Sequence, residues 1–270
     1  DLKGQKIRVM TNKYHIAYWN AVGAAATPMQ FTEVFMGLQQ GTIDGQENPY
    51  MNIVGNNVQE VQKYVVETNH LGHIITFYMN SDLYNGLPDN VRELVDACAK
   101  AATQYGNDRA DESIAEYKKT CEDAGCQIIT LDDSVLAELR DKAQVVYDMV
   151  REDLGNEIVD KLLAAVDTVR ETVVDETTLG DEITAVDPAD IDGEYHWTAA
   201  MTVADTSINY MMVDKFAELI NEKSGGKISV DIYPGGQLGN TTEFTEAVIG
   251  GSIDIGTGMS TDLVDFIPQF

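Results

Sequence analysis

The sequence predicts an α/β protein in which helices cover a largely parallel sheet. Strand-like and helix-like segments alternate through residues 195–270, and such alternation favours parallel strands joined by helical crossovers. An uninterrupted helical pattern over 89–123 predicts one long helix. The apolar segment IRVM, at 7–10, follows a charged start and is typical of a short buried strand.

Residues 1–173 contain several further predicted elements. Residues 14–28 predict a helix that ends at Gly23 and is followed by a turn. Ser81 and Asp82 are suited to cap a short helix, and Asp89 is suited to cap the long one. After the long helix we expect a strand, CQIITL, and helices over 132–150 and 155–173.

An acidic segment separates this part from the last quarter of the chain. Between Glu171 and Tyr195 there are nine acids and no Lys, Arg or His, which predicts a linker over 174–194. The DPADIDG stretch has a calcium-loop composition, but its acid spacing departs from the EF-hand pattern. The chain then alternates again, with strands HWTAAMTV and KISVDIYP, a helix over 205–226, another from about Thr241, and a last short strand.

Composition excludes two classes of partner. The 270 residues carry 45 acids and 18 bases, a formal charge of −27. A chain with this balance has no basic surface for nucleic acid or anionic lipid, so an anionic ligand needs a locally placed cation. No apolar run is long enough for a membrane span, and we expect a mature exported protein without its signal peptide.

The three cysteines do not form a metal or redox motif, because none is part of a CxxC pair. Cys121 and Cys126 flank a predicted helix end, where they either close a small local disulfide or stay free. Cys98 is expected to be a small buried helix residue.

One short pattern occurs twice. TIDG at 42–45 and SIDIG at 252–256 each follow a predicted helix and a glycine. We expect Ile43 and Ile253 to be core residues, and the aspartates to cap turns rather than to bind ligand, although strand ends of this kind can face a cleft.

The longest stretches resemble the solute-binding proteins of TRAP transporters, of the DctP type. The resemblance covers most of the chain outside 171–195 and is carried by DLKGQKIRV, GAAATPMQFTEVFMGLQQGTIDGQENPY, EVQKYVVETNH, KSGGKISVDIYPGGQLG and AVIGGSIDIGTG. It implies a two-lobed, periplasmic-binding-protein-like fold of type II, with hinge strands and a long helix. It also implies a periplasmic or extracellular receptor that delivers a small organic acid to TRAP membrane permease subunits, with no cofactor and no catalysis.

The order of the segments departs from the family. The part that resembles the amino-terminal half of such a receptor, lobe I, is 195–270, and the part that resembles the carboxy-terminal half is 1–173. A stretch of several tens of residues that the family carries between them, with a second Arg-bearing strand, has no counterpart. Circular permutation, tandem modules joined by the 174–194 linker, and an unusual numbering are the three explanations, and a neighbouring chain in a swapped dimer is one way to supply the missing stretch.

Arg8 and Asn48 are the main candidates for the ligand site. Arg8 lies in an apolar strand, where its planar guanidinium is suited to bind a ligand carboxylate. The structural alternative is an ion pair with a nearby acidic side chain of the protein. The resemblance implies that Arg8 clamps the ligand carboxylate and that Asn48 donates to it from beside Pro49, adding no charge. Without the resemblance, Asn48 is interpreted as an ordinary turn residue before proline.

The resemblance implies further ligand-site residues. Phe31 matches a position that packs on the apolar part of the ligand, and Glu47 and His70 match a polar pair that couples lobe closure in some relatives. The remaining candidates for lining the site are Trp19, Tyr14, Thr202, Asp205, Tyr210 and Met259. Each also has a structural interpretation, as a core residue or as a histidine whose hydrogen bonds are satisfied within the protein. His70 and His73 form an HxxH pair, but no third metal ligand stands at a suitable spacing.

Two other functions remain open from sequence. Asp44, Glu47 and His70 contain the groups of an acid–base catalyst, but nothing supplies a nucleophile, a phosphate loop or a complete metal site. A sensor or surface module built from tandem solute-binding units is the other alternative, and the acidic linker favours it.

Overall fold

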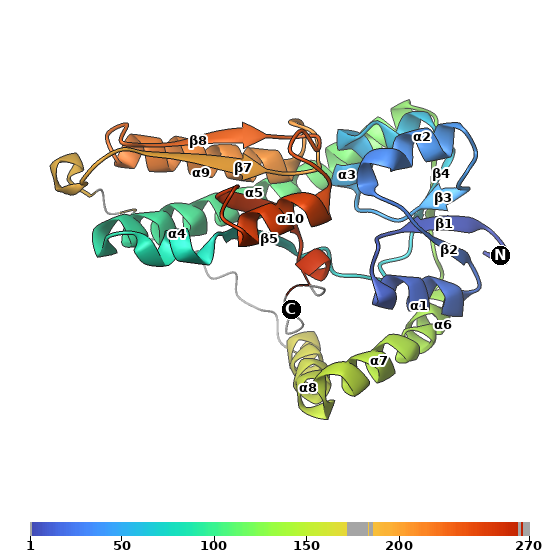
Figure 1. Ribbon diagram of the computed structural model, residues 1–270. Helices are drawn as coiled ribbons and strands as arrows, with labels where there is room; N and C mark the ends of the chain where they lie inside the picture. The colour runs from blue at the N-terminus through green and yellow to red at the C-terminus, as the bar shows by residue number, and fades with distance from the viewer. Residues whose placement is uncertain (1, 172–182, 184–185, 264–265, 267–270) are drawn as a thin grey trace.

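The computed structural model describes residues 2–171, 183, 186–263 and 266, and these residues form two lobes (Figure 1). One lobe contains a four-stranded sheet with long helices beside it. The other contains two smaller parallel sheets. The two-lobed α/β architecture that the resemblance implies is therefore present. Within the described residues, no helix combines the length and the apolarity needed to cross a membrane.

The larger sheet has the strand order β5-β9-β7-β8. Its strands are β5 (Ile75–Met79), β7 (Tyr195–Ala200), β8 (Ile228–Tyr233) and β9 (Ile255–Met259). Strand β7 pairs in parallel with both β8 and β9, as the alternation over 195–270 predicts. Strand β5 comes from the other half of the chain and pairs antiparallel with β9. The lobe is thus built from both halves of the sequence.

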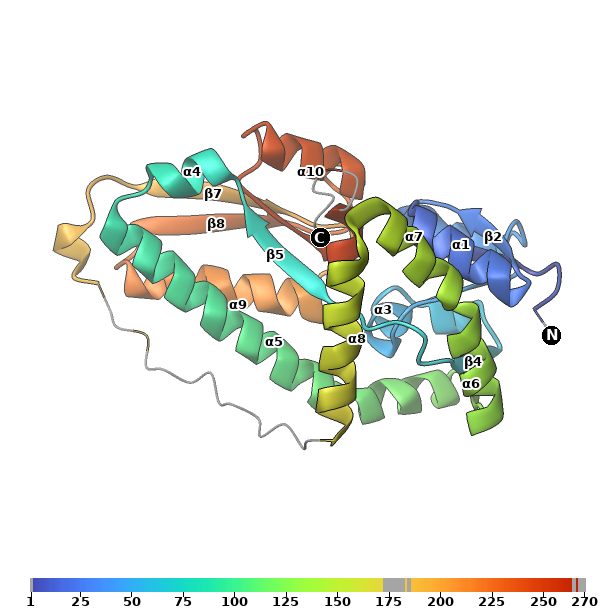
Figure 2. The ribbon, with the colours of Figure 1, turned by 90° about the horizontal axis from the view of Figure 1, so that it is seen from below.

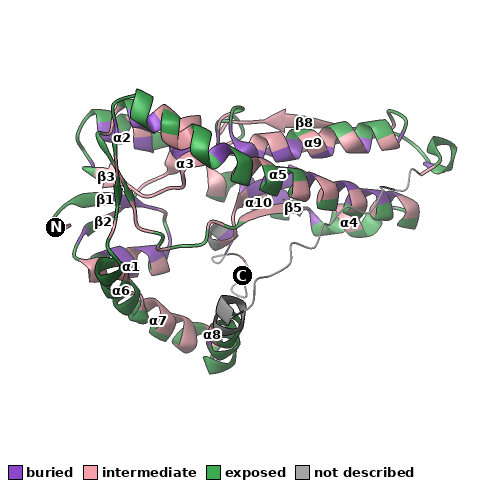
Figure 3. Ribbon diagram, turned by 180° about the vertical axis from the view of Figure 1, so that it is seen from behind, coloured by how far each residue is buried: buried purple, intermediate pink, exposed green. Residues whose placement is uncertain are grey.

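Helices α9 and α5 lie side by side against this sheet (Figure 2). The helices of the lobe are α4 (Ser81–Gly86), α5 (Asp89–Asp123), α9 (Ile208–Lys223) and α10 (Thr241–Ile249). The inner faces of α5 and α9 are buried, with Val91, Phe216 and Ile220 fully enclosed, whereas their outer faces are exposed (Figure 3). The long helix 89–123 is confirmed over its full length.

Helix caps differ in part from the sequence prediction. Asn80 caps α4 with its side-chain oxygen, which accepts from the Leu83 amide at 2.8 Å, so the prediction for Ser81 and Asp82 was wrong by one position. Pro88 precedes α5, and Asp89 is its first residue, where its charge favours the helix dipole. Asn240 and Glu243 form a reciprocal capping box at the start of α10.

The second lobe begins with a parallel sheet of order β2-β1-β3. Its strands are β1 (Lys6–Val9), β2 (Ala25–Pro28) and β3 (Gly45–Gln46), and its helices are α1 (Lys13–Val22), α2 (Val34–Gln39) and α3 (Tyr50–Gly55). Helix α1 ends at Gly23, which adopts the left-handed φ of 102° that a side chain would disfavour. Residues 25–28 are a strand rather than the predicted turn, because they pair with β1.

A two-stranded sheet and three helices complete the described part. Strands β4 (Tyr64–Glu67) and β6 (Gln127–Thr130) pair in parallel, and α6 (Asp133–Lys142), α7 (Gln144–Leu154) and α8 (Asn156–Glu171) follow. The predicted helix 132–150 is divided at Ala143. Four 3-10 turns lie at Phe31–Glu33, Val58–Glu60, Pro188–Asp190 and Ser260–Leu263.

The repeated Ile–Asp pattern has the same structural role in both lobes. Ile43 and Ile253 are buried, as predicted. The Asp44 carboxylate accepts from the Lys6 amide at 2.8 Å, and the Asp44 amide donates back to the Lys6 carbonyl at 2.8 Å. In the other lobe, the Asp254 carboxylate accepts from the amide of Thr198 in β7, and the Asp254 amide donates back to the Thr198 carbonyl. The aspartates are therefore strand anchors, which agrees with the structural interpretation of this pattern.

The predicted linker is only partly a solvated segment. Residues 174–182, 184 and 185 lie outside the described residues. Farther on, Ile191 is buried in the core, its carbonyl accepts from the Lys227 ammonium, and the Asp190 carbonyl accepts from Asn90 at 2.9 Å. The three cysteines are free and buried, so Cys121 and Cys126 do not form the disulfide that their spacing allowed.

Candidate functional site

Arg8 lines a cavity between the two lobes. The cavity has a volume of about 80 Å³ and is lined from one lobe by Arg8, Phe31 and Asn48, and from the other by Thr202, Thr257 and Met259. The lining therefore brings together five of the residues that the sequence selected, from segments far apart in the chain. Arg8 is the only Lys or Arg among the residues that line this cavity.

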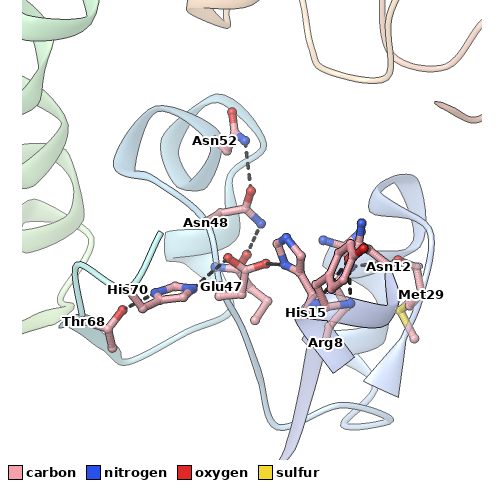
Figure 4. Close-up of polar contacts among 11 residues, drawn as sticks. Arg8, Asn12, His15, Met29, Glu47, Asn48, Asn52, Thr68 and His70 are labelled. Carbon is pink, nitrogen blue, oxygen red and sulfur yellow. Dashed lines mark hydrogen bonds and ion pairs between the residues drawn. The ribbon is translucent and has the colours of Figure 1, made fainter. Parts of the chain in front are cut away.

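The structure positions the Arg8 side chain through its backbone and aromatic surroundings. Arg8 is in the central strand β1 and is only 3% exposed. Its Nε donates to the Met29 carbonyl at 2.8 Å (Figure 4). The guanidinium carbon lies 5.6 Å from the centre of the Phe31 ring. A buried guanidinium held in this way is suited to a planar anion, because its fork can donate two parallel hydrogen bonds.

A chain of amides leads away from Asn48. Its Nδ2 donates to Gln46 Oε1 at 2.5 Å, and its Oδ1 accepts from Asn52 Nδ2 at 2.9 Å (Figure 4). Asn52 is four residues farther on, one turn of the helix that begins after Pro49, so the two amides face each other. The amides of Gln46 and Asn48 therefore belong to one network, which fixes the orientation of the Asn48 amide in the lining of the Arg8 cavity.

Three buried polar atoms in the lining of this cavity have no hydrogen-bond partner among the described residues. They are Asn52 Oδ1, His73 Nε2 and Thr257 Oγ1. Asn52 and Thr257 are 6% and 3% exposed, so an unpaired atom there carries a desolvation cost. None of these residues was a predicted site residue. For Asn52, the sequence offered one signal: it lies four residues after Asn48, close to one helical turn. Asn48 precedes α3 and Asn52 lies within it.

Glu47 is the centre of a second polar cluster. Its carboxylate lies 3.6 Å from His15 Nδ1 and 3.4 Å from His70 Nε2, and Thr68 Oγ1 hydrogen-bonds to His70 Nδ1 at 2.7 Å (Figure 4). The sequence predicted the pairing of Glu47 with His70 but not the contribution of His15. Within the described ranges, no three His, Cys, Asp or Glu side chains are grouped so that they could hold a metal ion.

Burial and these histidines act on Glu47 in opposite directions. Burial alone raises the pKa of the Glu47 carboxyl, but contacts with His15 and His70 outweigh it and lower that pKa to about 2. Burial lowers the pKa of His73 to about 4, so its imidazole is neutral at pH 7. The cluster at Glu47 therefore keeps a carboxylate ionised, and His73 presents a neutral ring to the Arg8 cavity.

Other predicted site residues do not line the Arg8 cavity. Trp19 is buried and packs edge-on against His70, with ring centres 5.1 Å apart. With Glu47 and His70 it lines a different cavity of about 690 Å³. Asp205 is exposed on the turn before α9, and Tyr14 donates to Asp153 at 2.7 Å. Tyr210 packs against the core of the larger lobe.

A match to a known protein family now identifies the chain independently. The family described as bacterial extracellular solute-binding protein, family 7 (DctP), matches residues 1–153 and 199–270. The C4-dicarboxylate-binding periplasmic protein DctP of Rhodobacter capsulatus is 33% identical over 168 residues, which are 62% of this chain and 49% of that protein. A solute-binding protein of Verminephrobacter eiseniae is 40% identical over 43% of this chain and 35% of its own length.

Solved structures agree with this match. The TRAP periplasmic solute-binding protein of Shewanella oneidensis, with bound succinate, has a TM-score of 0.55 and 28% identity, over 61% of this chain and 54% of that one. The chain spans about half the length of the relatives it matches, or less. Neither the family match nor these relatives test the exchanged order of segments, which stays a prediction. The chain belongs to bacterial extracellular solute-binding protein family 7, the solute-binding proteins of TRAP transporters.

Proposed function

We propose that this protein captures a small organic acid between its two lobes and clamps the carboxylate with Arg8. The observation that carries the proposal is the position of Arg8, which is buried, held by the Met29 carbonyl and set at a cavity between the lobes. A guanidinium out of water costs free energy unless an anion or several acceptors compensate it. A ligand carboxylate is a suitable compensating group.

Asn48 assists by donating an amide hydrogen bond beside the guanidinium, once a ligand competes with Gln46 for its Nδ2. Phe31 and Met259, from opposite sides of the cavity, contact the apolar part of the acid. Closure of the lobes removes water from the ion pair and strengthens it. The closed form then delivers the acid to a TRAP permease outside the cytoplasm, without chemistry on the ligand.

Several relatives and structures bind acids or related solutes. The Rhodobacter capsulatus relative is named for C4-dicarboxylates, the Shewanella oneidensis structure contains succinate, and a Bordetella structure at 29% identity has density attributed to pantoate. These names support the class of ligand and leave its identity open. We further propose that 195–270 corresponds to the amino-terminal part of such a receptor, lobe I, and 1–173 to its carboxy-terminal part, so that the two parts stand in exchanged order relative to the family.

A thermal-shift screen against organic acids tests the proposal. An acid at a hundredfold excess over its Kd stabilises the folded state by about 2.7 kcal/mol, a shift that is easily measured. We expect stabilisation of the wild type but not of Arg8→Lys, which keeps the charge and loses the planar fork. Arg140→Ala, which removes an exposed arginine of α6, is the matched control. Equal stabilisation of Arg8→Lys and wild type would contradict the clamp.

A further inference from the structure

The Arg8 cavity contains a second set of polar atoms, apart from those of Arg8 and Asn48. Asn52 lies in α3 of the smaller lobe, His73 in the connection between β4 and β5, and Thr257 in β9 of the larger lobe. All three line the cavity, and each has a buried side-chain atom without a hydrogen-bond partner among the described residues. Both lobes therefore offer unsatisfied polar groups to whatever occupies this space.

The amide network decides which atom of Asn52 is available. Asn52 Nδ2 donates to Asn48 Oδ1 at 2.9 Å, and Asn48 Nδ2 donates to Gln46 Oε1 (Figure 4). Because Asn48 uses its amide nitrogen as a donor, here to Gln46 and in the proposed function to a carboxylate, its oxygen accepts from Asn52. Asn52 is left with Oδ1, which can only accept. A ligand atom that satisfies it has to be an O–H or N–H donor.

The other two groups adapt to such a donor. The Thr257 hydroxyl both donates and accepts, and the role of His73 Nε2 depends on the tautomer of the ring. Burial lowers the pKa of His73 to about 4, so the ring adds no charge near neutral pH. Asn52 and Thr257 are buried, so leaving them unpaired costs free energy in the complex. A hydroxyl both donates and accepts, so it can satisfy Asn52 together with either of the other two.

The lining also limits the charge of the ligand. Arg8 is the only Lys or Arg that lines the cavity, and no Asp or Glu stands among the described residues that line it. Arg8 balances one carboxylate. A second carboxylate enters without a cation and an ammonium enters without an anion, and an uncompensated buried charge is costly. The ligand that fits this lining therefore carries one negative charge, and its remaining polar groups are neutral.

We propose that Asn52, with Thr257 and His73, is the specificity element of this site and selects a short hydroxy monocarboxylic acid over an unsubstituted acid and over a dicarboxylate. The inference rests on the proposed function, because it concerns the acid that Arg8 holds. The cavity of about 80 Å³ has room for several water-sized groups, which favours a short acid. The Rhodobacter capsulatus relative is named for C4-dicarboxylates, so the inference separates this chain from it in specificity.

Calorimetric titration with acids of one four-carbon skeleton tests the selection. The probes are butyrate, its 2-, 3- and 4-hydroxy derivatives, the corresponding methoxy acids, and succinate. We expect the best hydroxy acid to bind at least about tenfold more tightly than butyrate and than succinate. Its methoxy counterpart accepts but cannot donate, and should bind no more tightly than butyrate. Butyrate or succinate binding as tightly as every hydroxy acid overturns the inference, as does the absence of binding by any hydroxy acid.

Two nearly isosteric variants assign the selection to these residues. Asn52→Leu removes the acceptor and Thr257→Val removes the hydroxyl, and each should reduce the preference for the hydroxy acid over butyrate to below about threefold. Thr103→Val, exposed on α5, is the matched control and should keep the preference. The ratio of two affinities in one variant is insensitive to a general loss of stability, and Thr257→Val alone suffices if Asn52→Leu does not fold.

Arg8→Lys separates this inference from the proposed function. Loss of every acid in Arg8→Lys, with an unchanged preference for the hydroxy acid in Thr257→Val and Asn52→Leu, overturns the specificity element and leaves the clamp intact. Acids that bind Arg8→Lys as tightly as wild type contradict the clamp itself, and the specificity element with it.

Discussion

The two aspartate anchors show how a single side chain fixes the start of a strand. Asp254 Oδ2 accepts from the Thr198 amide at 2.8 Å and from Thr198 Oγ1 at 3.0 Å, and it is partly buried. Asp44 anchors Lys6 in the same way but is exposed. The sequence repeat TIDG/SIDIG therefore encodes a structural device that is shared by both lobes.

Replacing these aspartates tests the difference in burial. We expect Asp254→Ala to lower the free energy of unfolding by about 1–3 kcal/mol, because the Thr198 amide loses its side-chain acceptor inside the fold. Asp44→Ala is the matched control and should cost less than about 1 kcal/mol, since water can replace an exposed carboxylate. Urea unfolding measures both. Equal costs for the two variants would show that burial does not set the strength of the anchor.

His73 gives the stability a defined pH dependence. Its pKa is about 4 in the folded protein and 6.5 in the unfolded chain, so the unfolded state binds more protons between these values. Stability from the neutral ring is fully present above pH 6.5, and falls as the pH drops through this window, by up to ~3 kcal/mol.

The variant His73→Gln should lose this contribution. We expect the difference in unfolding free energy between wild type and variant to shrink steadily from about pH 7 to about pH 4 and to level off below. The Glu47 carboxylate contributes to stability at a lower pH: this contribution is lost as the pH falls from its ordinary pKa of 4.5 to about 2. The pH windows of His73 and Glu47 can therefore be told apart. A difference that is constant across the window of His73 would contradict the assignment to this residue.

The free thiols give a direct check on local packing. Burial raises the pKa of the Cys98 and Cys121 thiols to about 11 and also raises the pKa of Cys126. All three should react slowly with a thiol reagent in the native state and rapidly in urea. Three reactive thiols in urea without reductant are expected, and a count of one would reveal a Cys121–Cys126 disulfide.

At the scale of elements, the contact of α5 with α9 depends on a glycine. A Cβ on Gly106 would lie 3.2 Å from both Cβ and Cγ of Met212 on α9. Gly106→Val should therefore destabilise the protein by about 1–3 kcal/mol through overpacking, measured by urea unfolding. Met212→Ala in the same molecule should recover part of this loss. Strict additivity of the two substitutions would show that the helices do not meet at this point.

Elements with a strong local pattern were predictable from sequence. The 35-residue helix α5 and the parallel strands β7 and β8 follow from periodicity and alternation. The helix break at Ala143 and the strand 25–28 were missed, because each depends on packing or pairing with distant residues. The antiparallel β5 could not be foreseen for the same reason, since its partner β9 lies near the other end of the chain.

The site was predictable in part. Arg8, Phe31, Asn48, Thr202 and Met259 meet at one cavity, but the matched motifs rather than their spacing selected them. Asn52, His73 and Thr257 were missed because unpaired buried atoms are visible only after folding. Trp19, Glu47 and His70 were grouped with the ligand site, but all three line the separate cavity of about 690 Å³, and Glu47 and His70 belong to the polar cluster centred on Glu47.

At the scale of the whole molecule, the buried Arg8 guanidinium lies at a cavity between the two lobes of a strongly acidic protein. A net charge of −27 repels anions at long range, so capture of an acid has to depend on local desolvated contacts at Arg8. The two halves of the chain are joined in the larger lobe through β5, α4 and α5.

The most direct test of the central claim is a calorimetric titration of the best-stabilising acid and of its neutral carboxamide. Truncating one partner of a buried charge pair costs about 2–5 kcal/mol. We therefore expect the carboxamide to bind the wild type at least about thirtyfold more weakly than the acid does, and the acid to bind Arg8→Ala more weakly than wild type by a similar factor. Arg140→Ala should bind like wild type. If the carboxamide binds wild type as tightly as the acid does, a carboxylate clamp at Arg8 is not the basis of recognition.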